Sequence, residues 1–348
     1  DRTVRRLFPV DPGEPVTVLE GRGRWLTPGF VDAHTHLAWG RFEAADRPAA
    51  GSPAGLEQVR RACASTLACG VTAVRDAGGL QTRPAGDAPR LRLSLDIIGA
   101  GDARGAQHLR ERVRSLVDAG AQWIKVAATG GVGAPPDRVL TPVLSGEEFA
   151  AVVATADALG TPVMVHAWGG EAVDWAIRLG VRSIEHGVHL TPGQARAAAA
   201  AGVVVVPTVG IYRSVLAMAA SGEVDARYAA AAAAAVAADH GDVRACLDAG
   251  VALAMGTDAG TDRQHGSNLA EVAALVGCGL APATALVAAT FTGARLLGLP
   301  EPLAPGSDAD FVLFDADPAL PGVVADRARL VAVVQGGRQV AGHDTPPR

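Results

Sequence analysis

The stretch Thr161–Gly187, TPVMVHAWGGEAVDWAIRLGVRSIEHG, contains one complete strand–helix–strand unit. Its two apolar runs, Pro162–Ala167 and Arg182–Gly187, enclose a helical pattern from Ala172 to Leu179. Gly180 follows the helix, as is typical where a chain leaves a helix in a left-handed conformation. Because both runs are almost continuously apolar and do not alternate with polar residues, they predict parallel strands that are buried on both faces.

The same unit recurs on both sides of this stretch. Eight apolar runs are expected to be strands: Phe30–His36, Val71–Asp76, Leu93–Gly99, Trp123–Ala128, Pro162–Ala167, Arg182–Gly187, Val203–Thr208 and Val251–Asp258. The expected helices between them include Leu56–Ala68, Leu109–Ala119, Glu147–Leu159, Ala172–Leu179, Pro192–Ala201 and Tyr228–Ala249. Eight such units in about 250 residues predict an α/β protein with a closed (β/α)8 TIM barrel. A doubly wound open sheet is the alternative.

The two ends of the chain have a different pattern. Residues 1–27 and 302–348 are strand-like, carry turn residues and show no helical period. Asp310–Asp315 and Leu330–Val334, the latter followed by Gly336-Gly337, are typical of short antiparallel strands. Chain ends often lie close together. We therefore expect residues 1–27 and 302–348 to form one small β-sandwich domain, flanking a barrel of residues 28–301.

Composition excludes several classes of protein. The chain has 348 residues, of which 49% are hydrophobic and 19% charged, so a large core is available and general disorder is excluded. No apolar run is long enough to span a membrane, and a net charge of -5 gives no reason to expect a nucleic-acid partner. The partner expected is a small-molecule substrate, and an oligomer of identical subunits is compatible with the sequence.

Cysteine usage bears on the compartment. The four cysteines form no C-x-x-C pair and no dense framework, which favours buried thiols and a reducing, cytoplasmic location. No signal peptide is recognisable. The chain begins at Asp1 without a methionine, which leaves open what precedes it.

One residue count stands out. Of the 31 Lys and Arg residues, 30 are Arg, and Lys125 is the only lysine. Such a preference indicates a GC-rich coding sequence in which Arg serves wherever any cation is sufficient. Lys125, in the expected strand Trp123–Ala128, therefore marks a place where a guanidinium does not suffice.

Other polar residues gather at the ends of the expected strands. His34 and His36 lie two residues apart, so both side chains point to the same face of the first strand. His166, His186 and Asp258 end the fifth, sixth and eighth strands. In a barrel these ends meet at the mouth where active sites lie.

Imidazole and carboxylate groups are common ligands of divalent ions. Six groups exceed what one catalytic ion needs, which favours two ions close together with a bridging anion. Lys125 can supply the bridge, because burial lowers the pKa of an amine below its usual ~10.4 and the neutral amine can capture CO2 as a carbamate. Arg cannot follow this route. We expect two divalent ions per subunit, with Zn favoured and Mn, Fe or Co possible.

Several motifs together resemble the metal-dependent amidohydrolase superfamily over nearly the whole chain. They are Pro28–Leu37 (PGFVDAHTHL), Ile124–Val126 before Ala128–Val132 (ATGGV), Val165–Ala167, Ile184–Gly187 (IEHG), Gly256–Gly260 (GTDAG) and Leu303–Val312 (LAPGSDADFV). The resemblance implies that His34, His36 and Asp258 bind one ion, His166 and His186 bind the second, and carboxylated Lys125 bridges them.

Within the superfamily, Ile-Lys followed by Thr-Gly-Gly-Val is similar to the prolidase-like branch, which hydrolyses Xaa-Pro and Xaa-Arg dipeptides and N-acyl amino acids. The segment 266–299 also resembles that branch. Two features depart from it: the loop 99–105 is shorter than usual, and only about 27 residues precede the barrel.

The implied activity is a binuclear amidohydrolase in which a metal-bridging hydroxide attacks an amide, most naturally that of a dipeptide or an N-acyl amino acid. Asp258 would act as general base and then protonate the leaving nitrogen. A cyclic amidase, imidase or lactonase is the alternative, since the same hydroxide attacks ring amides and esters. A catalytically silent metal-retaining binding protein is an alternative of another class.

Weaker candidates lie in the loops at the mouth. Tyr212 could hydrogen-bond the oxyanion or a substrate carboxylate, and His265 could contact substrate. Arg138 and Arg213 could hold a substrate carboxylate. Asn268 is expected to make a helix cap or a loop hydrogen bond.

Overall fold

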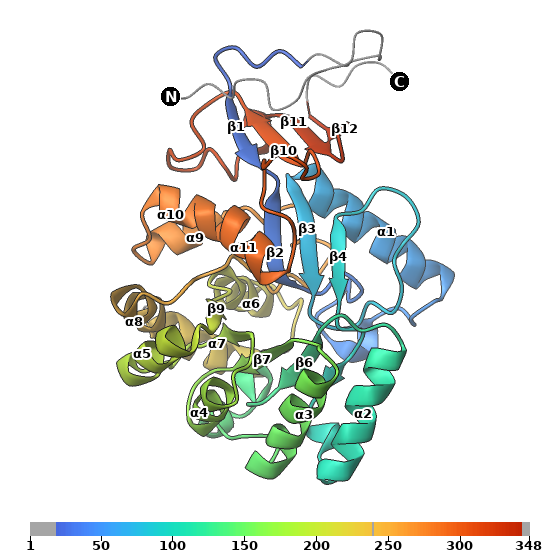
Figure 1. Ribbon diagram of the computed structural model, residues 1–348, viewed down its shortest axis with the longest axis vertical. Coiled ribbons are helices and arrows are strands. Elements are labelled where there is room, and N and C mark those ends of the chain that lie inside the picture. The colour runs from blue at the N-terminus through green and yellow to red at the C-terminus, as the bar shows by residue number, and fades with distance from the viewer. Residues whose placement is uncertain (1–18, 239, 343–348) are drawn as a thin grey trace.

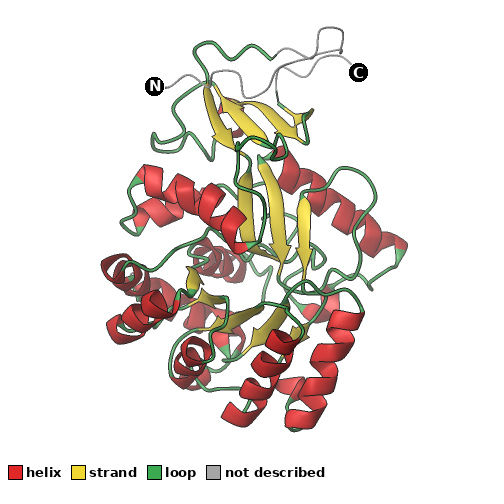
Figure 2. Ribbon diagram, viewed as in Figure 1, coloured by secondary structure: helices red, strands yellow, loops and turns green. Residues whose placement is uncertain are grey.

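A computed structural model describes residues 19–238 and 240–342 and shows two parallel sheets, surrounding helices and one antiparallel sheet (Figures 1 and 2). The first parallel sheet contains β2 (Phe30–Thr35), β3 (Val71–Asp76) and β4 (Arg90–Leu93). The second contains β5 (Ile97–Ile98), β6 (Ile124–Ala127), β7 (Val163–Ala167), β8 (Ser183–His186) and β9 (Val204–Val206). The parallel strand pairing confirms the α/β class.

Helices follow most of the strands. The longer ones are α1 (Pro53–Ala68), α2 (Ala106–Asp118), α3 (Gly146–Ala158), α4 (Glu171–Arg178), α5 (Pro192–Ala201), α6 (Gly210–Ala220), α7 (Arg227–Ala237), α8 (Gly241–Ala249) and α9 (Ala270–Gly277). After them, α10 (Pro282–Val287) continues through a π-helical turn, Ala288–Thr292, into α11 (Gly293–Leu296). Short 3-10 turns lie at Ala44–Asp46, Ala100–Asp102, Gly131–Gly133, Pro136–Arg138 and Arg327–Arg329.

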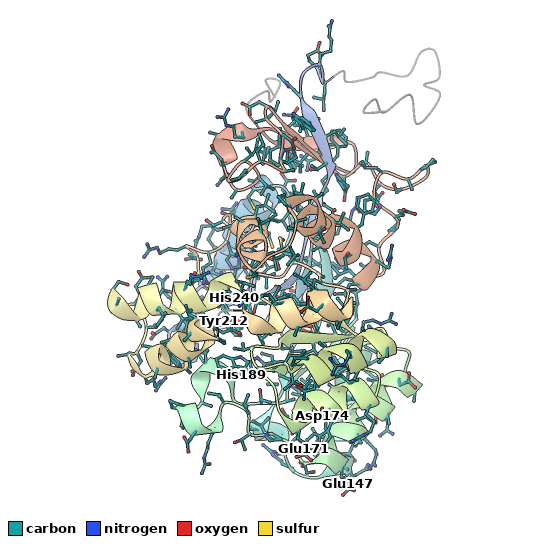
Figure 3. The ribbon with its side chains drawn as sticks, turned by 90° about the vertical axis from the view of Figure 1, so that its left-hand side faces the viewer. Glu147, Glu171, Asp174, His189, Tyr212 and His240 are labelled. Atoms are coloured by element: carbon teal, nitrogen blue, oxygen red, sulfur yellow. The ribbon has the colours of Figure 1, made fainter. Side chains whose placement is uncertain are left out.

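Most of the predicted elements are confirmed to within a few residues. Local chemistry explains where the helices begin: Ser145 and Thr191 each cap a helix with a side-chain oxygen, and Glu148 and Gln194 complete the two capping boxes. Figure 3 shows Glu147 on α3 and Glu171 and Asp174 on α4, and all three are exposed. The helices therefore turn polar faces outward and apolar faces toward the sheets.

Two predicted elements were wrong in detail. The strand Leu93–Gly99 is divided, because Leu95 adopts a left-handed conformation (φ 63°) between β4 and β5. The single helix Tyr228–Ala249 is two helices, α7 and α8, because His240 adopts φ 53° immediately before α8. Neither left-handed position is occupied by glycine, so the sequence did not indicate a change of backbone direction there.

The predicted strand Val251–Asp258 is not a regular strand. It is an extended segment that forms one parallel bridge to β9 at Leu253 and is followed by one to β2 at Ala259. The backbone N–H of Ala33 also donates to the carbonyl of Met255 at 2.8 Å. Gly256 allows this close approach, since a Cβ there would lie 2.4 Å from a Val206 methyl group. The segment thus connects the last strand of the second sheet to the first strand of the first.

The antiparallel sheet combines both ends of the described chain. Its order is β1 (Trp25–Pro28), β10 (Phe311–Phe314), β11 (Leu330–Gln335) and β12 (Arg338–Ala341). Phe314 packs edge to face on Phe30 of β2, with ring centroids 6.2 Å apart, which joins this sheet to the parallel one. Residues 1–18 and 343–348 of the predicted flanking domain lie outside the described residues. No helix in residues 19–238 or 240–342 is long and apolar enough to cross a membrane.

Candidate metal centre

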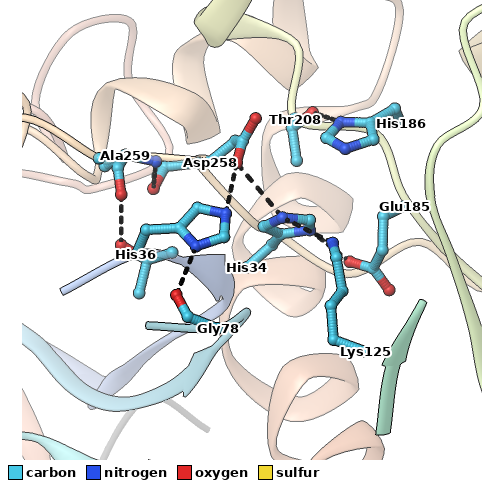
Figure 4. Close-up of polar contacts among 12 residues, drawn as sticks. His34, His36, Gly78, Lys125, Glu185, His186, Thr208, Asp258 and Ala259 are labelled. Carbon is cyan, nitrogen blue, oxygen red and sulfur yellow. Dashed lines mark hydrogen bonds and ion pairs between the residues drawn. The ribbon is translucent and has the colours of Figure 1, made fainter. Parts of the chain in front are cut away.

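The six predicted metal-binding side chains line one cavity of about 450 Å³. Five of them come from the carboxyl ends of β2, β7 and β8 and from the segment after β9, and Lys125 comes from within β6, in the arrangement that Figure 4 shows in part. The residues are His34, His36, Lys125, His166, His186 and Asp258. Parallel strands bring their carboxyl ends to the same edge of a sheet, which is why residues so far apart in sequence meet here.

His34, His36 and Asp258 form the tightest group. Asp258 Oδ1 lies 3.3 Å from His34 Nε2 and 3.2 Å from His36 Nε2. One ligand atom from each residue falls within 4.8 Å of the others, which is close enough for a single ion to contact all three. Asp258 is at φ 53°, and this backbone reversal follows Gly256 and Thr257.

The other three residues are grouped around His34. Lys125 Nζ is 3.2 Å from His34 Nε2. The rings of His166 and His186 stand 4.4 Å apart, and the His186 ring is 5.0 Å from that of His34. His34 is therefore the residue that contacts both Lys125 and the His166–His186 pair.

A second layer of contacts orients the histidines. His34 Nδ1 donates to Glu185 Oε2 at 2.7 Å, and His36 Nδ1 donates to the Gly78 carbonyl at 2.9 Å (Figure 4). Because these acceptors favour the tautomer with a proton on Nδ1, Nε2 is the ring nitrogen that each histidine offers to the cavity. His186 Nδ1 contacts Thr208 Oγ1 at 2.7 Å in the same manner.

The charge states suit metal ligands. Burial lowers the pKa of His166 to about 3, with Lys125 adding to the effect, and burial holds the pKa of His186 well below its usual value. Burial also lowers the pKa of Lys125 to about 8, although Glu185 and Asp258 act to raise it. Burial acts to raise the pKa of Asp258, but the nearby histidines outweigh it and keep the carboxylate ionised. Neutral imidazoles beside a carboxylate are a suitable donor set for a divalent ion.

Glu185 is held by a second buried charge that sequence reasoning missed. Arg75 Nη2 lies 2.9 Å from Glu185 Oε1, Ser183 Oγ contacts the same oxygen, and Arg75 stacks over Trp123 at 4.3 Å. Arg75 and Glu185 are both fully buried. A charged residue inside an apolar strand was the available signal, but nothing in the sequence indicated which partner it has.

Tyr212 lines the cavity, as predicted for a residue that meets substrate. Its ring packs edge to face on Trp168, with centroids 5.3 Å apart, and burial raises the pKa of its hydroxyl well above the usual value. The buried hydroxyl makes no hydrogen bond of normal geometry to the described part of the chain. It is therefore free to donate to a bound molecule.

The remaining candidates are placed elsewhere. His265 is buried, and its backbone N–H donates to the carbonyl of Thr261. It does not line the cavity, so its predicted substrate contact stays a prediction. Arg138 and Arg213 do not line it either. Asn268 makes the expected loop hydrogen bond, accepting from Gly266 N, and its Nδ2 donates to Asp32 of β2 at 2.8 Å. All four cysteines are free and buried, as predicted.

Comparisons with known proteins find relatives over most of the described chain. Residues 25–340 match the model of the amidohydrolase family. An uncharacterised protein of Mycobacterium tuberculosis is 31% identical over 93% of this chain and 90% of its own length. An imidazolonepropionase of Paracidovorax citrulli is 28% identical over 90% of this chain and 82% of its own length.

Solved structures show the same fold. A prolidase complexed with N-methylphosphonate-L-proline superposes with a TM-score of 0.82 and 27% identity, covering 94% of this chain and 90% of that one. An amidohydrolase superposes with a TM-score of 0.86 and 26% identity over 97% of this chain and 91% of that one. Because the family model matches residues 25–340 and a relative is 31% identical over 93% of the chain, the chain belongs to the amidohydrolase family.

Proposed function

We propose that this protein is a binuclear metal-dependent hydrolase that cleaves the amide bond of a dipeptide or an N-acyl amino acid. The observation that carries the proposal is the convergence of His34, His36, Lys125 and Asp258 with the His166–His186 pair on one cavity. A chain without metal chemistry would have no reason to bury its only lysine among four histidines.

The fold proposed for it is a closed (β/α)8 barrel of residues 28–301 with a small β-sandwich domain from residues 1–27 and 302–348. Two connections support closure. The extended segment after β9 bonds to both β9 and β2. At the other junction, the N–H groups of Gln122 and Trp123, just before β6, donate to the carbonyl of Leu93 in β4.

The donor set fits two divalent ions. His34, His36 and Asp258 would hold one, His166 and His186 the other, and a carboxylated Lys125 would contact both. The lowered pKa of Lys125 supports carboxylation, because a neutral amine is the form that captures CO2. Bound divalent ions would lower the pKa of a water molecule and polarise the scissile carbonyl. Zn is the favoured metal, with Mn, Fe or Co as the other candidates.

The chain's own residues would handle protons and position the substrate. Asp258, ionised in the cavity, can accept a proton at Oδ1 or Oδ2 and return it to the leaving nitrogen. The Tyr212 hydroxyl, which makes no hydrogen bond of normal geometry within the described chain, can donate to the oxygen of the scissile carbonyl. The aromatic lining of the cavity around Trp168 and Phe42 would exclude bulk water.

The relatives support two substrate classes. The prolidase bound to an L-proline derivative favours an acyclic amide of an amino acid. The imidazolonepropionases favour a cyclic amide as the second candidate, for which the same side chains would serve. A lactonase and a silent metal-retaining protein remain further outcomes of the test.

The test is a substrate panel with metal-loaded protein, containing dipeptides, N-acyl amino acids, cyclic imides, imidazolones and lactones. Acyclic amides should be hydrolysed with the highest kcat/KM. A preference for cyclic amides or lactones would select the alternative, and failure across the whole panel would leave a binding protein.

The variant Lys125→Arg tests the metal bridge. It keeps the positive charge but cannot form a carbamate, so we expect loss of bound metal and of most activity. Arg114→Lys, on the exposed face of α2, is the matched control and should keep both. Normal metal content with near-normal turnover in Lys125→Arg would refute the bridge.

A further inference from the structure

The loop after β2 forms one wall of the cavity and carries a cation that the metal centre does not use. Arg47 lies in this loop, is half-buried and lines the cavity together with Trp39 and Phe42. It also lines an adjoining cavity of about 410 Å³, which shares Trp39 with the first. Arg47 is therefore accessible to a molecule that occupies either space.

The Arg47 guanidinium is fixed in place. Its Nε donates to the carbonyl of Arg41 at 3.2 Å, and its Nη2 donates to the carbonyl of Phe42 at 2.7 Å. The guanidinium carbon, Cζ, lies 3.6 Å from the centre of the Trp39 ring. The Trp39 ring in turn stacks on the His36 ring, with centroids 3.6 Å apart and an interplanar angle of 12°. Trp39 thus couples the position of Arg47 to a candidate metal ligand.

The fixed guanidinium lacks an acidic partner. In residues 19–238 and 240–342, no carboxylate lies within ion-pair distance of Arg47. Glu43, which also lines the cavity, accepts instead from Arg227 Nη2 at 3.2 Å and from the Tyr228 hydroxyl at 2.9 Å. With Glu43 neutralised by Arg227, this wall retains one net positive charge. A half-buried cation without a carboxylate favours an anionic ligand.

The rest of the wall is aromatic. The chain contains only two tyrosines, and both Tyr212 and Tyr228 line this cavity with Trp39, Phe42 and Trp168. Tyr228 packs edge to face on Phe42, with centroids 5.0 Å apart. Aromatic faces of this size bind large apolar groups.

We infer that Arg47 binds the free carboxylate of the substrate while the aromatic wall holds a bulky apolar side chain. The substrate class is then an N-acyl aromatic amino acid or a dipeptide with a bulky apolar residue. Arg47 takes the role that the sequence suggested for Arg138 or Arg213, neither of which reaches the cavity. This inference rests on the proposed function, because it names the substrate of the same site.

The kinetic test compares N-acetyl-L-phenylalanine with its carboxamide in metal-loaded protein. The wild type should prefer the carboxylate, and Arg47→Gln should lower kcat/KM for the carboxylate about 10- to 100-fold, mainly through KM. The carboxamide should change much less, so the ratio of the two constants is the readout. Any displacement of the loop would affect both substrates alike and leave the ratio unchanged.

Two further variants sharpen the result. Arg47→Lys keeps the charge without the planar fork and should have an intermediate ratio. Arg41→Gln, in the same loop, removes a side chain that is 64% exposed and should leave the ratio as in the wild type. N-acetyl-L-alanine should be at least about tenfold poorer than the phenylalanine derivative. An equal loss for both phenylalanine substrates in Arg47→Gln, or no carboxylate preference in the wild type, would overturn the assignment.

A binding measurement separates this inference from the proposed function. L-phenylalanine and L-phenylalaninol contain no amide and differ in the carboxylate. Calorimetry with metal-loaded protein should show about tenfold tighter binding of L-phenylalanine, and the difference should disappear in Arg47→Gln. If no amide is hydrolysed but this difference appears, the hydrolase proposal fails and the Arg47 site stands. If amides are hydrolysed but the difference is absent, the Arg47 site fails alone.

Discussion

Replacing Glu185 by Gln changes two hydrogen bonds that meet beside the candidate metal centre. The carboxylate accepts from His34 Nδ1 through Oε2 and from Arg75 Nη2 through Oε1. A glutamine amide has one oxygen and one NH₂ group. If the oxygen stays with Arg75, the NH₂ group faces His34 Nδ1 and requires it to accept. The neutral imidazole then carries its proton on Nε2, the atom that faces Asp258 and would bind metal.

The expected effect on metal binding follows from this tautomer. Loss of the group that orients a ligating histidine weakens metal affinity about 10- to 100-fold. We expect Glu185→Gln to lose affinity in this range, equivalent to about 1.4–2.8 kcal/mol. The free energy of unfolding should also fall by about 3–5 kcal/mol, because Arg75 is fully buried and loses its only carboxylate partner in the described chain.

Competition with a chromogenic chelator measures the affinity, and urea denaturation measures the stability. The double variant Arg75→Met/Glu185→Gln is the control that separates them. It removes the unpaired charge, so it should recover much of the stability while metal affinity stays low. A folded Glu185→Gln protein whose metal affinity is within about twofold of the wild type would refute the role given to Glu185.

Three other perturbations give independent tests. Tyr212→Phe should lower kcat about 100-fold with little change in stability, because its hydroxyl has no hydrogen bond to lose in the described chain; Tyr228→Phe removes a bond to Glu43 and should instead cost about 1 kcal/mol of stability. A large loss of stability in Tyr212→Phe would contradict this assignment. Burial raises the pKa of Asp242 to about 7 in the folded chain, so its contribution to stability is complete below its usual pKa of 3.8 and is lost as pH rises through 7. Urea titrations should show that the free energy of unfolding falls by about 1 kcal/mol between pH 6 and 9, and that this fall is absent in Asp242→Asn. An equal pH dependence of the two proteins would rule out this role of Asp242. Removing metal with a chelator should lower the thermal midpoint by about 5 °C, reversibly on adding Zn, since ligands that bind only the folded state stabilise it; an unchanged midpoint would argue against a metal bound in the cavity.

The candidate ligands could be predicted because strand ends converge. Once His34, His166 and His186 were each assigned to the end of a parallel strand, the geometry of such sheets required their side chains to meet. The pattern could not predict backbone reversals at residues other than glycine. Leu95 and His240 interrupt a strand and a helix in conformations that their own residue types disfavour, so tertiary contacts decide them.

The contacts of Glu185 with His34 and Arg75 could not be predicted from the sequence for a different reason. Glu185 is 151 residues from His34 and 110 from Arg75. All three residues are recognisable in the sequence as polar or charged residues within apolar runs. If such a residue is buried, it needs a hydrogen-bond or ion-pair partner. The requirement does not identify the partner, because other acidic residues compete: Asp32 and Asp76 are fully buried, and Asp258 is largely buried.

The arginine-rich composition had opposite effects on two functional residues. Lys125 could be identified because it is the only lysine, and its chemistry is one that the other 30 cations cannot perform. Arg47 was hidden for the same reason, since nothing in its neighbouring sequence distinguishes it from other loop arginines. What sets Arg47 apart is its partners: Glu43 is committed to Arg227, and Trp39 holds the guanidinium at the cavity. A functional residue of a rare type can therefore be found by counting residue types in the sequence. A functional residue of a common type can be found only from the structure, once the contacts of its neighbours show that its charge has no partner of opposite sign.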